Sequence, residues 1–298
     1  MQKIKISFII NPISGGQKKD HLPKLISKYL NKDKFDFSFH FTKYKGHASE
    51  LSGNGSADFY IVAGGDGTLN EVASKLIHSS AGMGILPLGS GNGLARHLGI
   101  EMNTAKAIEQ LNTAEESYID TCSLNGKPFI NMAGVGFDAH IGKMFAESTK
   151  RGFKTYVLQT LKEFKNYKSK SYQLKYQDFE IKHEAFLLSI ANSSQYGNNA
   201  FIAPKAELND GLFDVCLLKP FKLWEMPGIG FRLFNKSIDK SPLMHSFRTN
   251  ELIIERETDG VAHLDGEPMH FGKTLHMRIH PSSLKILVPK KKGFKTQL

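Results

Sequence analysis

Residues 62–72 read Val-Ala-Gly-Gly-Asp-Gly-Thr-Leu-Asn-Glu-Val, and Asp66 is the one carboxylate among the glycines of this turn. An apolar run leads into the turn and helical spacing follows it, so the turn is expected to join a strand to a helix N-terminus. Backbone N–H groups and the helix dipole make such a turn an anion site, and glycine lets a ligand approach the backbone closely. Asp66 cannot bind phosphate directly, but it can bind a Mg²⁺ that bridges phosphates or orient a reacting hydroxyl. The alternative is that Asp66 only caps the helix.

Two more loops rich in glycine and polar residues follow apolar runs. Residues 11–16 read Asn-Pro-Ile-Ser-Gly-Gly, and residues 86–96 read Leu-Pro-Leu-Gly-Ser-Gly-Asn-Gly-Leu-Ala-Arg. The chain has neither the P-loop pattern nor a dinucleotide fingerprint after its first strand. In a parallel sheet, loops that follow the strands meet at the carboxyl edge, where ligands of α/β proteins bind. The three loops therefore predict one ligand site.

The elements that must position these loops alternate between strand and helix over residues 1–117. Alternating or continuous apolar runs predict strands at 3–10, 35–41, 59–63 and near 85–86. Apolar residues at helical spacing predict helices at 22–30, 47–51, 69–77 and 103–111. This order predicts an α/β fold with a parallel sheet between helices.

The pattern becomes rich in short strands from residue 118. Asn125-Gly126 lies between two strand-like runs and predicts a hairpin. Helical patterns occupy 138–167 and a piece near 223–234. We therefore expect an α/β domain at 1–117 and a β-rich domain at 118–283. The last strand, at 284–288 in the terminal segment 284–298, could belong to either domain, and its return to the first is one expectation.

Composition narrows the classes of protein and partner. The 298 residues carry a formal charge of +10, which favours nucleic acid, an anionic membrane surface or phosphorylated ligands, or else a solvated surface with no partner. The two cysteines, Cys122 and Cys216, have no metal or redox spacing, which fits a cytoplasmic protein. No stretch approaches the roughly 20 apolar residues of a membrane span, and no nucleic-acid-binding motif is found.

Read together and in order, the motifs resemble the diacylglycerol kinase catalytic-domain family, which includes bacterial lipid kinases, sphingosine kinases and ceramide kinases. The resemblance rests on the three loops, on residues 129–138 (Phe-Ile-Asn-Met-Ala-Gly-Val-Gly-Phe-Asp) and on residues 264–267 (Leu-Asp-Gly-Glu). The Gly-Gly-Asp-Gly-Thr turn alone is shared with NAD kinases and phosphofructokinases. The ordered set covers nearly the whole chain and is specific.

The resemblance implies a nucleotide domain similar to those of phosphofructokinase and NAD kinase, and a C-terminal β-sandwich domain that contributes to a lipid site. ATP would be the phosphate donor and Mg²⁺ its metal. Glu267 would be the proton acceptor with Asp265 beside it, and Asp66 would act through Mg²⁺. On local sequence alone, Asp265-Gly266-Glu267 reads as a solvated turn. The residues implied at the nucleotide are Asn11, Ser14, Gly15, Thr42, Gly64, Gly65, Asp66, Gly67, Thr68, Asn70, Glu71, Ser90, Gly91 and Asn92.

A second metal site is implied at residues 207–212. This segment resembles a structural Mg²⁺ loop of bacterial members, with the Asp210 side chain and the carbonyls of Glu207 and Leu212 as ligands. A plain Asp-Gly turn is the alternative. Ser90 stands where threonine is frequent in bacterial members, and Gly93 where an acidic residue often follows the asparagine, so the acceptor lipid stays open. His97, His140 and His263 are expected at structural or surface positions.

The sequence thus predicts an ATP- and Mg²⁺-dependent lipid kinase that transfers the γ-phosphate to a hydroxyl of a diacylglycerol or sphingoid-type acceptor. It is expected in the cytoplasm, in peripheral contact with a membrane, with no nucleic-acid partner; a homodimer is allowed by the sequence but not established by it. The alternatives are an NAD kinase and a catalytically silent module that binds lipid or nucleotide.

Overall fold

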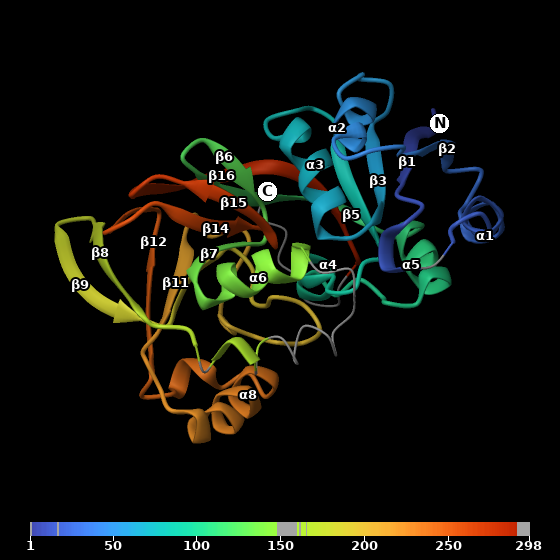
Figure 1. Ribbon diagram of the computed structural model, residues 1–298. Coiled ribbons are helices and arrows are strands. Elements are labelled where there is room, and N and C mark those ends of the chain that lie inside the picture. Colours follow the sequence, from blue (N-terminus) through green and yellow to red (C-terminus); the bar gives the residue numbers. More distant parts are fainter. Residues whose placement is uncertain (1, 17, 148–159, 161, 165, 291–298) are drawn as a thin grey trace. The chain divides into compact units, whose positions relative to one another are not determined.

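The chain divides into two compact units, Met1–Ile119 with Ser282–Leu298 and Asp120–Pro281 (Figure 1). The computed structural model describes residues 2–16, 18–147, 160, 162–164 and 166–290. Two strands, β5 (Glu115–Leu124) and β16 (Thr274–Val288), contribute residues to both units.

The first unit is built on a parallel sheet. Its strands lie in the order β2 (Phe35–Phe41), β1 (Ile4–Ile10), β3 (Phe59–Gly64), β4 (Gly82–Pro87) and the last residues of β16. Every residue of β3 and β4 is buried, which explains why these central strands read as continuous apolar runs. Ile286 of β16 pairs in parallel with Met83 of β4, so the last strand returns to the first unit.

Helices cover both faces of this sheet (Figure 1). On one face α1 (Leu22–Tyr29) packs against α5 (Thr104–Leu111), and on the other α2 (His47–Ser52) packs against α3 (Asp66–Leu76). Two shorter pieces, η1 (Ser14–Gly16) and α4 (Gly93–His97), belong to the loops after β1 and β4. The predicted α/β fold is confirmed.

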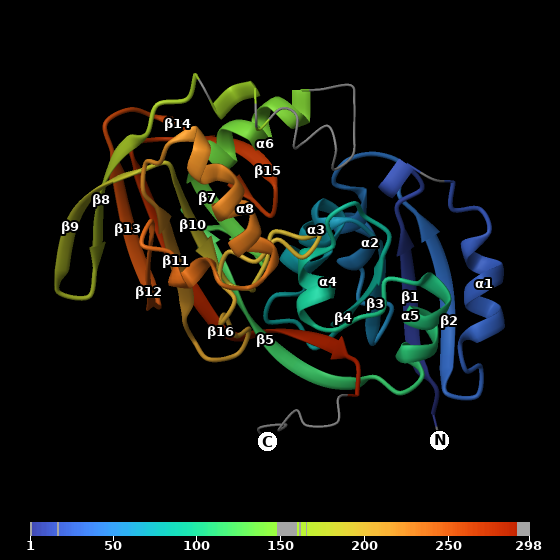
Figure 2. The same ribbon diagram turned by 90° about the horizontal axis from the view of Figure 1, so that it is seen from below.

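The second unit holds two antiparallel sheets (Figure 2). One has the order β12 (Met244–Thr249), β11 (Phe213–Leu218), β10 (Leu187–Ala191), β7 (Met132–Gly136), β14 (Gly260–Leu264), β15 (Glu267–Phe271). The other joins the first residues of β16 to β13 (Glu251–Arg256), β8 (Lys170–Tyr176) and β9 (Phe179–Ala185), with β5 and β6 (Lys127–Phe129) beside β16. Buried side chains from both sheets, among them Phe129, Tyr172 and Phe213, form one core, as in a β-sandwich.

A second core lies on the other face of the six-stranded sheet. It contains Phe137 and Ile141 of α6 (Phe137–Glu147) and Ile229 of α8 (Met226–Phe234). Two 3₁₀ turns, η2 (Leu223–Glu225) and η3 (Ile238–Lys240), flank α8. The helix predicted at 138–167 begins as α6, and much of its remainder falls outside the described residues.

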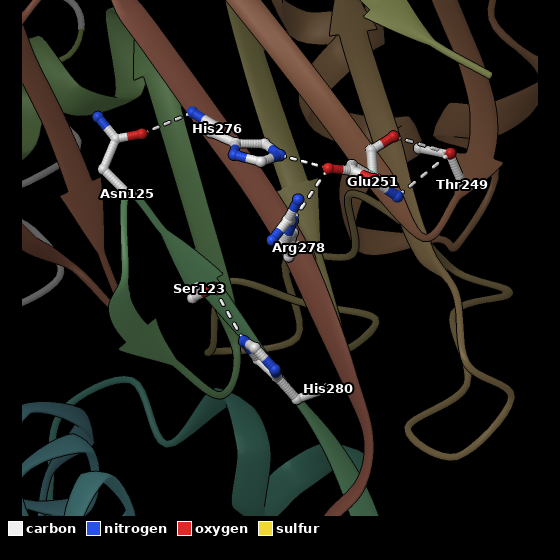
Figure 3. Close-up of polar contacts among 7 residues, drawn as sticks. All are labelled: Ser123, Asn125, Thr249, Glu251, His276, Arg278 and His280. Carbon is white, nitrogen blue, oxygen red and sulfur yellow. Dashed lines mark hydrogen bonds and ion pairs between the residues drawn. The ribbon is translucent and has the colours of Figure 1, made fainter. Parts of the chain in front are cut away.

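The predicted hairpin at Asn125-Gly126 is confirmed. Both residues have positive φ (47° and 78°), and the turn joins β5 to β6 through the pair Leu124–Lys127. The Asn125 side chain also binds β16. The backbone N–H of His276 donates to Oδ1 at 2.7 Å (Figure 3), and Nδ2 donates to the Thr274 carbonyl at 3.1 Å. The hairpin is therefore fastened to its neighbouring strand by an amide side chain as well as by ladder bonds.

The helices among the described residues are all too short or too polar to cross a membrane.

Candidate functional site

The three predicted loops meet at the carboxyl edge of the parallel sheet. Asn11 Nδ2 donates a hydrogen bond to Thr68 Oγ1 at 3.0 Å, which joins the first loop to the start of α3. Ser14 Oγ donates to the Leu88 carbonyl at 3.2 Å, and the Leu88 N–H donates to the Gly64 carbonyl at 3.0 Å. The structure thus brings Asn11, Ser14 and Thr68 together with the backbone of the other two loops.

Glycines allow this contact because the backbones touch where side chains would stand. A Cβ on Gly89 would lie 2.5 Å from the Cα of Gly65, and one on Gly15 would lie 2.3 Å from the Leu88 carbonyl oxygen. Gly15 also has φ of +62°, which favours glycine. The three loops therefore contact one another main chain to main chain, and we call this arrangement the cradle.

Asp66 is the first residue of α3 and not its N-cap. Gly65, which has no side chain, takes the N-cap position. Asp66 is therefore not the N-cap residue of the alternative interpretation. The first bond of the helix runs from Leu69 N–H to the Gly65 carbonyl at 3.0 Å, so the N–H groups of residues 66–68 have no acceptor within the helix. The helix dipole stabilises an acidic side chain here, and one carboxylate oxygen of Asp66 is buried.

Two side chains predicted at the nucleotide hold the loops, and their contact with a nucleotide stays a prediction. The Glu71 carboxylate accepts hydrogen bonds from the N–H groups of Gly46 (2.9 Å) and Ala48 (3.2 Å), at the start of α2. Asn92 closes its own loop, because Oδ1 accepts from the Gly89 N–H and Nδ2 donates to the Gly89 carbonyl, both at 2.9 Å. Through these contacts the Glu71 carboxylate positions the start of α2, and the Asn92 amide positions the backbone of its own loop.

Three further residues predicted at the nucleotide lie in the loops or in elements next to them. Thr42 directly follows β2, and its N–H donates to the Ile10 carbonyl at 2.9 Å at the end of β1. Ser90 is exposed at the tip of its loop, and Asn70 is half-buried in the first half of α3. Contact of these residues with a nucleotide stays a prediction.

The acidic turn of the second unit holds its two carboxylates in different environments. Asp265 and Gly266, with φ of 49° and 84°, form the tight turn between β14 and β15. Asp265 is 6% exposed, and its carboxylate accepts three backbone hydrogen bonds, from Ile130 (3.0 Å), Asn131 (2.8 Å) and Met132 (2.9 Å). The carboxylate of Asp265 therefore anchors the turn. Its expected catalytic role beside Glu267 stays a prediction.

Glu267 follows this anchored turn as the first residue of β15. It pairs with Leu264 across the hairpin and is half-buried. Of the two carboxylates, Glu267 is thus the one on the strand and the more accessible. Its role as proton acceptor stays a prediction.

A buried polar cluster on the six-stranded sheet escaped the sequence reasoning. Ser189, Gly134 and His263 lie in register on three neighbouring strands, and the carboxylate of Asp138 sits above them. Ser189 Oγ donates to Asp138 Oδ2 at 3.0 Å, and His263 Nε2 lies 3.2 Å from the same oxygen. A Cβ on Gly134 would lie 2.4 Å from that oxygen, so the glycine makes room for the carboxylate.

The sequence held one clue to this cluster. Gly134 and Asp138 stand four residues apart within the segment 129–138, but only strand register brings Ser189 and His263 to them. His263 was expected at a structural or surface position, and it is buried.

A polar cavity of about 450 Å³ lies in the second unit, lined in part by Tyr167, Tyr172 and Arg256. Burial, followed by the charge of Asp138, raises the pKa of Tyr172 well above its usual range. Burial also lowers the pKa of Arg256, whose guanidinium donates to the carbonyls of Gly260 at 2.8 Å and Phe271 at 2.7 Å. The polar lining of this cavity does not suit an acyl chain.

The loop expected to bind Mg²⁺ is already engaged by this chain's own donors. Asp210 Oδ1 accepts from the Leu212 N–H at 3.0 Å, and Oδ2 forms an ion pair with the guanidinium of Arg248. A divalent cation would have to displace Arg248, so these residues do not fit the metal in the conformation seen. Within the described part of the chain, no three His, Cys, Asp or Glu side chains gather as metal ligands would.

Comparison with known proteins places this architecture in a family. Residues 5–124 match the family model of the diacylglycerol kinase catalytic domain, and residues 131–288 match that of the YegS C-terminal NAD kinase beta sandwich-like domain. A probable lipid kinase YegS-like of Pseudomonas aeruginosa is 32% identical over 233 residues, which cover 77% of this chain and 76% of that protein. One of Klebsiella pneumoniae is 31% identical over 234 residues and covers 77% of both.

Solved structures show the same fold. The crystal structure of a putative diacylglycerol kinase from Bacillus anthracis superposes with a TM-score of 0.78, covers 97% of this chain and 96% of its own, and is 21% identical. Both family models together span nearly the whole chain, in the order of the two units. The chain therefore belongs to the diacylglycerol kinase catalytic-domain family of lipid kinases.

Proposed function

We propose that the protein is an ATP- and Mg²⁺-dependent kinase that phosphorylates a hydroxyl group of a diacylglycerol or sphingoid-type lipid at a membrane surface. The observation that carries the proposal is the cradle of three glycine loops with Asp66 at the start of α3. Family membership supports lipid as the class of acceptor.

Residues of the first unit would suit the binding of a nucleoside triphosphate. The N–H groups of residues 66–68 point out of the helix start and would hold phosphate oxygens, aided by the helix dipole. Asp66 is the carboxylate that would hold Mg²⁺ at those phosphates. When bound, ATP would supply the phosphoryl group, and Mg²⁺ would supply positive charge that offsets the negative charge of the phosphate oxygens.

The acidic turn would act on the acceptor. A lipid hydroxyl is a poor nucleophile, and a positioned carboxylate can take its proton as the phosphoryl group is transferred. Glu267 is the candidate base, because it is half-buried and follows a turn that three backbone bonds to Asp265 hold in place. Asp265 would thus be a positioning residue for Glu267.

Transfer of labelled phosphate from ATP tests the proposal. The acceptors are diacylglycerol, sphingosine and ceramide in mixed micelles, with NAD offered as a soluble acceptor in a parallel reaction. Label in a lipid, dependent on Mg²⁺, is expected. Label in NAD alone would establish the NAD kinase alternative, and ATP binding with no labelled acceptor would favour the silent module.

Two variants test the assigned residues. Glu267→Gln keeps the shape of the side chain and removes the base, so kcat is expected to fall roughly 10²- to 10⁴-fold with ATP binding retained. Asp66→Asn is expected to abolish the response to Mg²⁺. Asp178→Asn, at an exposed turn between β8 and β9, is the matched control and should keep full activity. Equal lipid labelling by Glu267→Gln and wild type would show that Glu267 is not the base.

A further inference from the structure

A short stretch of the second unit carries an unusual concentration of exposed apolar side chains. Leu223 is 42% exposed, Trp224 73%, Phe231 67% and Phe234 50%. All four lie on η2 and α8, at the margin of the second unit in Figure 1. We call these four side chains the apolar patch. Exposed apolar side chains gathered on one short segment often mark an interaction site in a folded protein.

The two faces of α8 explain why the patch is not simply core. Ile229 is buried and Leu233 packs against the same core cluster, so the inner face of the helix is already satisfied. Phe231 and Phe234 project from the rest of the helix into solvent. A surface helix usually carries polar residues there, and a helix that is apolar on both faces is normally covered.

Cationic residues neighbour the apolar patch in the sequence. Lys219, Lys222, Arg232 and Lys236 lie within the segment 219–236, and Glu225 is its one carboxylate. Glu225 is engaged locally, because Oε2 accepts the backbone N–H of Lys222 at 2.7 Å. Lys222 Nζ lies 4.9 Å from the centre of the Trp224 ring, so a cation stands directly beside the most exposed aromatic side chain.

We propose that the η2–α8 segment is the surface by which this protein docks on an anionic lipid bilayer. The apolar patch would enter the boundary between headgroups and acyl chains, and the flanking lysines and Arg232 would bind anionic headgroups. Tryptophan prefers this boundary because its ring is apolar and its N–H is polar.

Charge favours a bilayer over a second copy of the chain. A two-fold symmetric contact would place the four cations of one segment against the same four of its partner, and like charges would oppose it. An anionic surface meets both the cations and the apolar side chains, and the formal charge of +10 acts in the same direction. The use of this surface by the enzyme rests on the proposed function, but binding to vesicles does not.

The test uses the fluorescence of Trp224, the only tryptophan in the chain. The full-length protein, without nucleotide, is mixed with vesicles of phosphatidylglycerol and phosphatidylcholine. We expect a blue shift of the emission, quenching by brominated acyl chains, and co-sedimentation that weakens as salt is raised. Vesicles of phosphatidylcholine alone should bind much more weakly.

Matched variants locate the contact. Replacing both Phe231 and Phe234 with serine should lower the vesicle partition coefficient at least about tenfold. Phe179→Ser, which removes a 58% exposed phenylalanine on β9, should leave it unchanged. Lys222→Glu with Lys236→Glu should weaken binding to anionic vesicles, and Lys182→Glu on β9 should do so much less.

The outcomes separate this inference from the proposed function. Vesicle binding that keeps Trp224 in water, or that survives loss of both phenylalanines, would overturn it. So would a blue shift that appears without vesicles as the protein doubles its mass, which would assign the patch to self-association. If the wild type docks as expected but phosphorylates no lipid in micelles, the docking surface stands and the proposed function fails.

Discussion

At the scale of single residues, two neighbouring carboxylates lie in different environments. Asp265 and Glu267 are separated by one glycine, yet Asp265 is turned into the backbone of residues 130–132 while Glu267 starts a strand. Their residue types cannot distinguish the two roles. The distinction comes from which backbone donors are within reach of each carboxylate. It can be measured by comparing how substitution of each residue changes the free energy of unfolding and the turnover number.

Asp265→Asn should therefore destabilise the protein more than Glu267→Gln does. The amide keeps one oxygen, which can still accept from Asn131 and Met132, but it places an NH₂ group against the Ile130 N–H that donates to Oδ2. We therefore expect a loss of about 2–4 kcal/mol in the free energy of unfolding. Urea unfolding of the two variants measures this. Unchanged stability of Asp265→Asn would contradict the anchoring role.

His183 provides a pH prediction at the same scale. Burial, then the positive charges of His245 and Lys219, lower its pKa below 6.5. Because the unfolded chain takes up this proton first, the stability that His183 contributes is present above pH 6.5 and decreases as pH falls through that range.

NMR titration of the imidazole signals checks the shift. His183 should titrate below 6.5, and His245→Gln should raise its pKa only in part, since burial is the larger cause. A normal pKa for His183 in the wild type would refute the shift, and full restoration by His245→Gln would show that burial is not its main cause.

At the scale of elements, the sequence predicts what local pattern determines. Asn125-Gly126 predicts its hairpin because a two-residue type I′ turn needs positive φ at both residues, and Asn and Gly adopt that conformation readily. The loops after β1, β3 and β4 were predicted to meet because parallel strands share an edge. The cluster of Asp138 with His263 could not be predicted, because it depends on the register of β10, β7 and β14, which are far apart in sequence.

The side-chain partners within the predicted loops were also beyond reach. Glu71 and Asn92 belong to the matched motifs, yet they bind the backbone of α2 and of the 89–92 loop. A motif records that a residue type is needed, and only the folded geometry separates binding a ligand from shaping the loop that binds it.

Asn125 gives a prediction for an element. Asn125→Ala loses two hydrogen bonds to β16 and places alanine at positive φ, so we expect a loss of about 2–4 kcal/mol. Asn125→Gly loses the same hydrogen bonds but tolerates the conformation, and should cost about 1 kcal/mol less. Thermal unfolding ranks the variants, and equal midpoints would show that the backbone conformation contributes nothing.

At the scale of the whole molecule, a bound nucleotide should stabilise the folded chain. At an ATP concentration of about 100 times Kd with Mg²⁺, the gain is about 2.7 kcal/mol, seen as a rise in Tm. Gly89→Ala should abolish the rise, because its Cβ would lie 2.5 Å from the Cα of Gly65.

Gly272→Ala is the control for this experiment, since its Cβ meets no atom within 4 Å. It should respond to MgATP as the wild type does. A full rise of Tm in Gly89→Ala would show that the contact between the loops is not needed for binding.

The return of β16 to the first unit affects how the protein is made. Ile286 pairs with Met83, the Ser283 carbonyl accepts the His78 N–H, and Lys285 forms an ion pair with Glu116. The first unit thus includes a strand that the ribosome synthesises after the entire second unit. Domains emerging from the ribosome usually fold from the N-terminal one onward. Here the first unit to emerge completes its sheet last, so a chain halted at the end of the β-sandwich would carry all three glycine loops on an unfinished sheet.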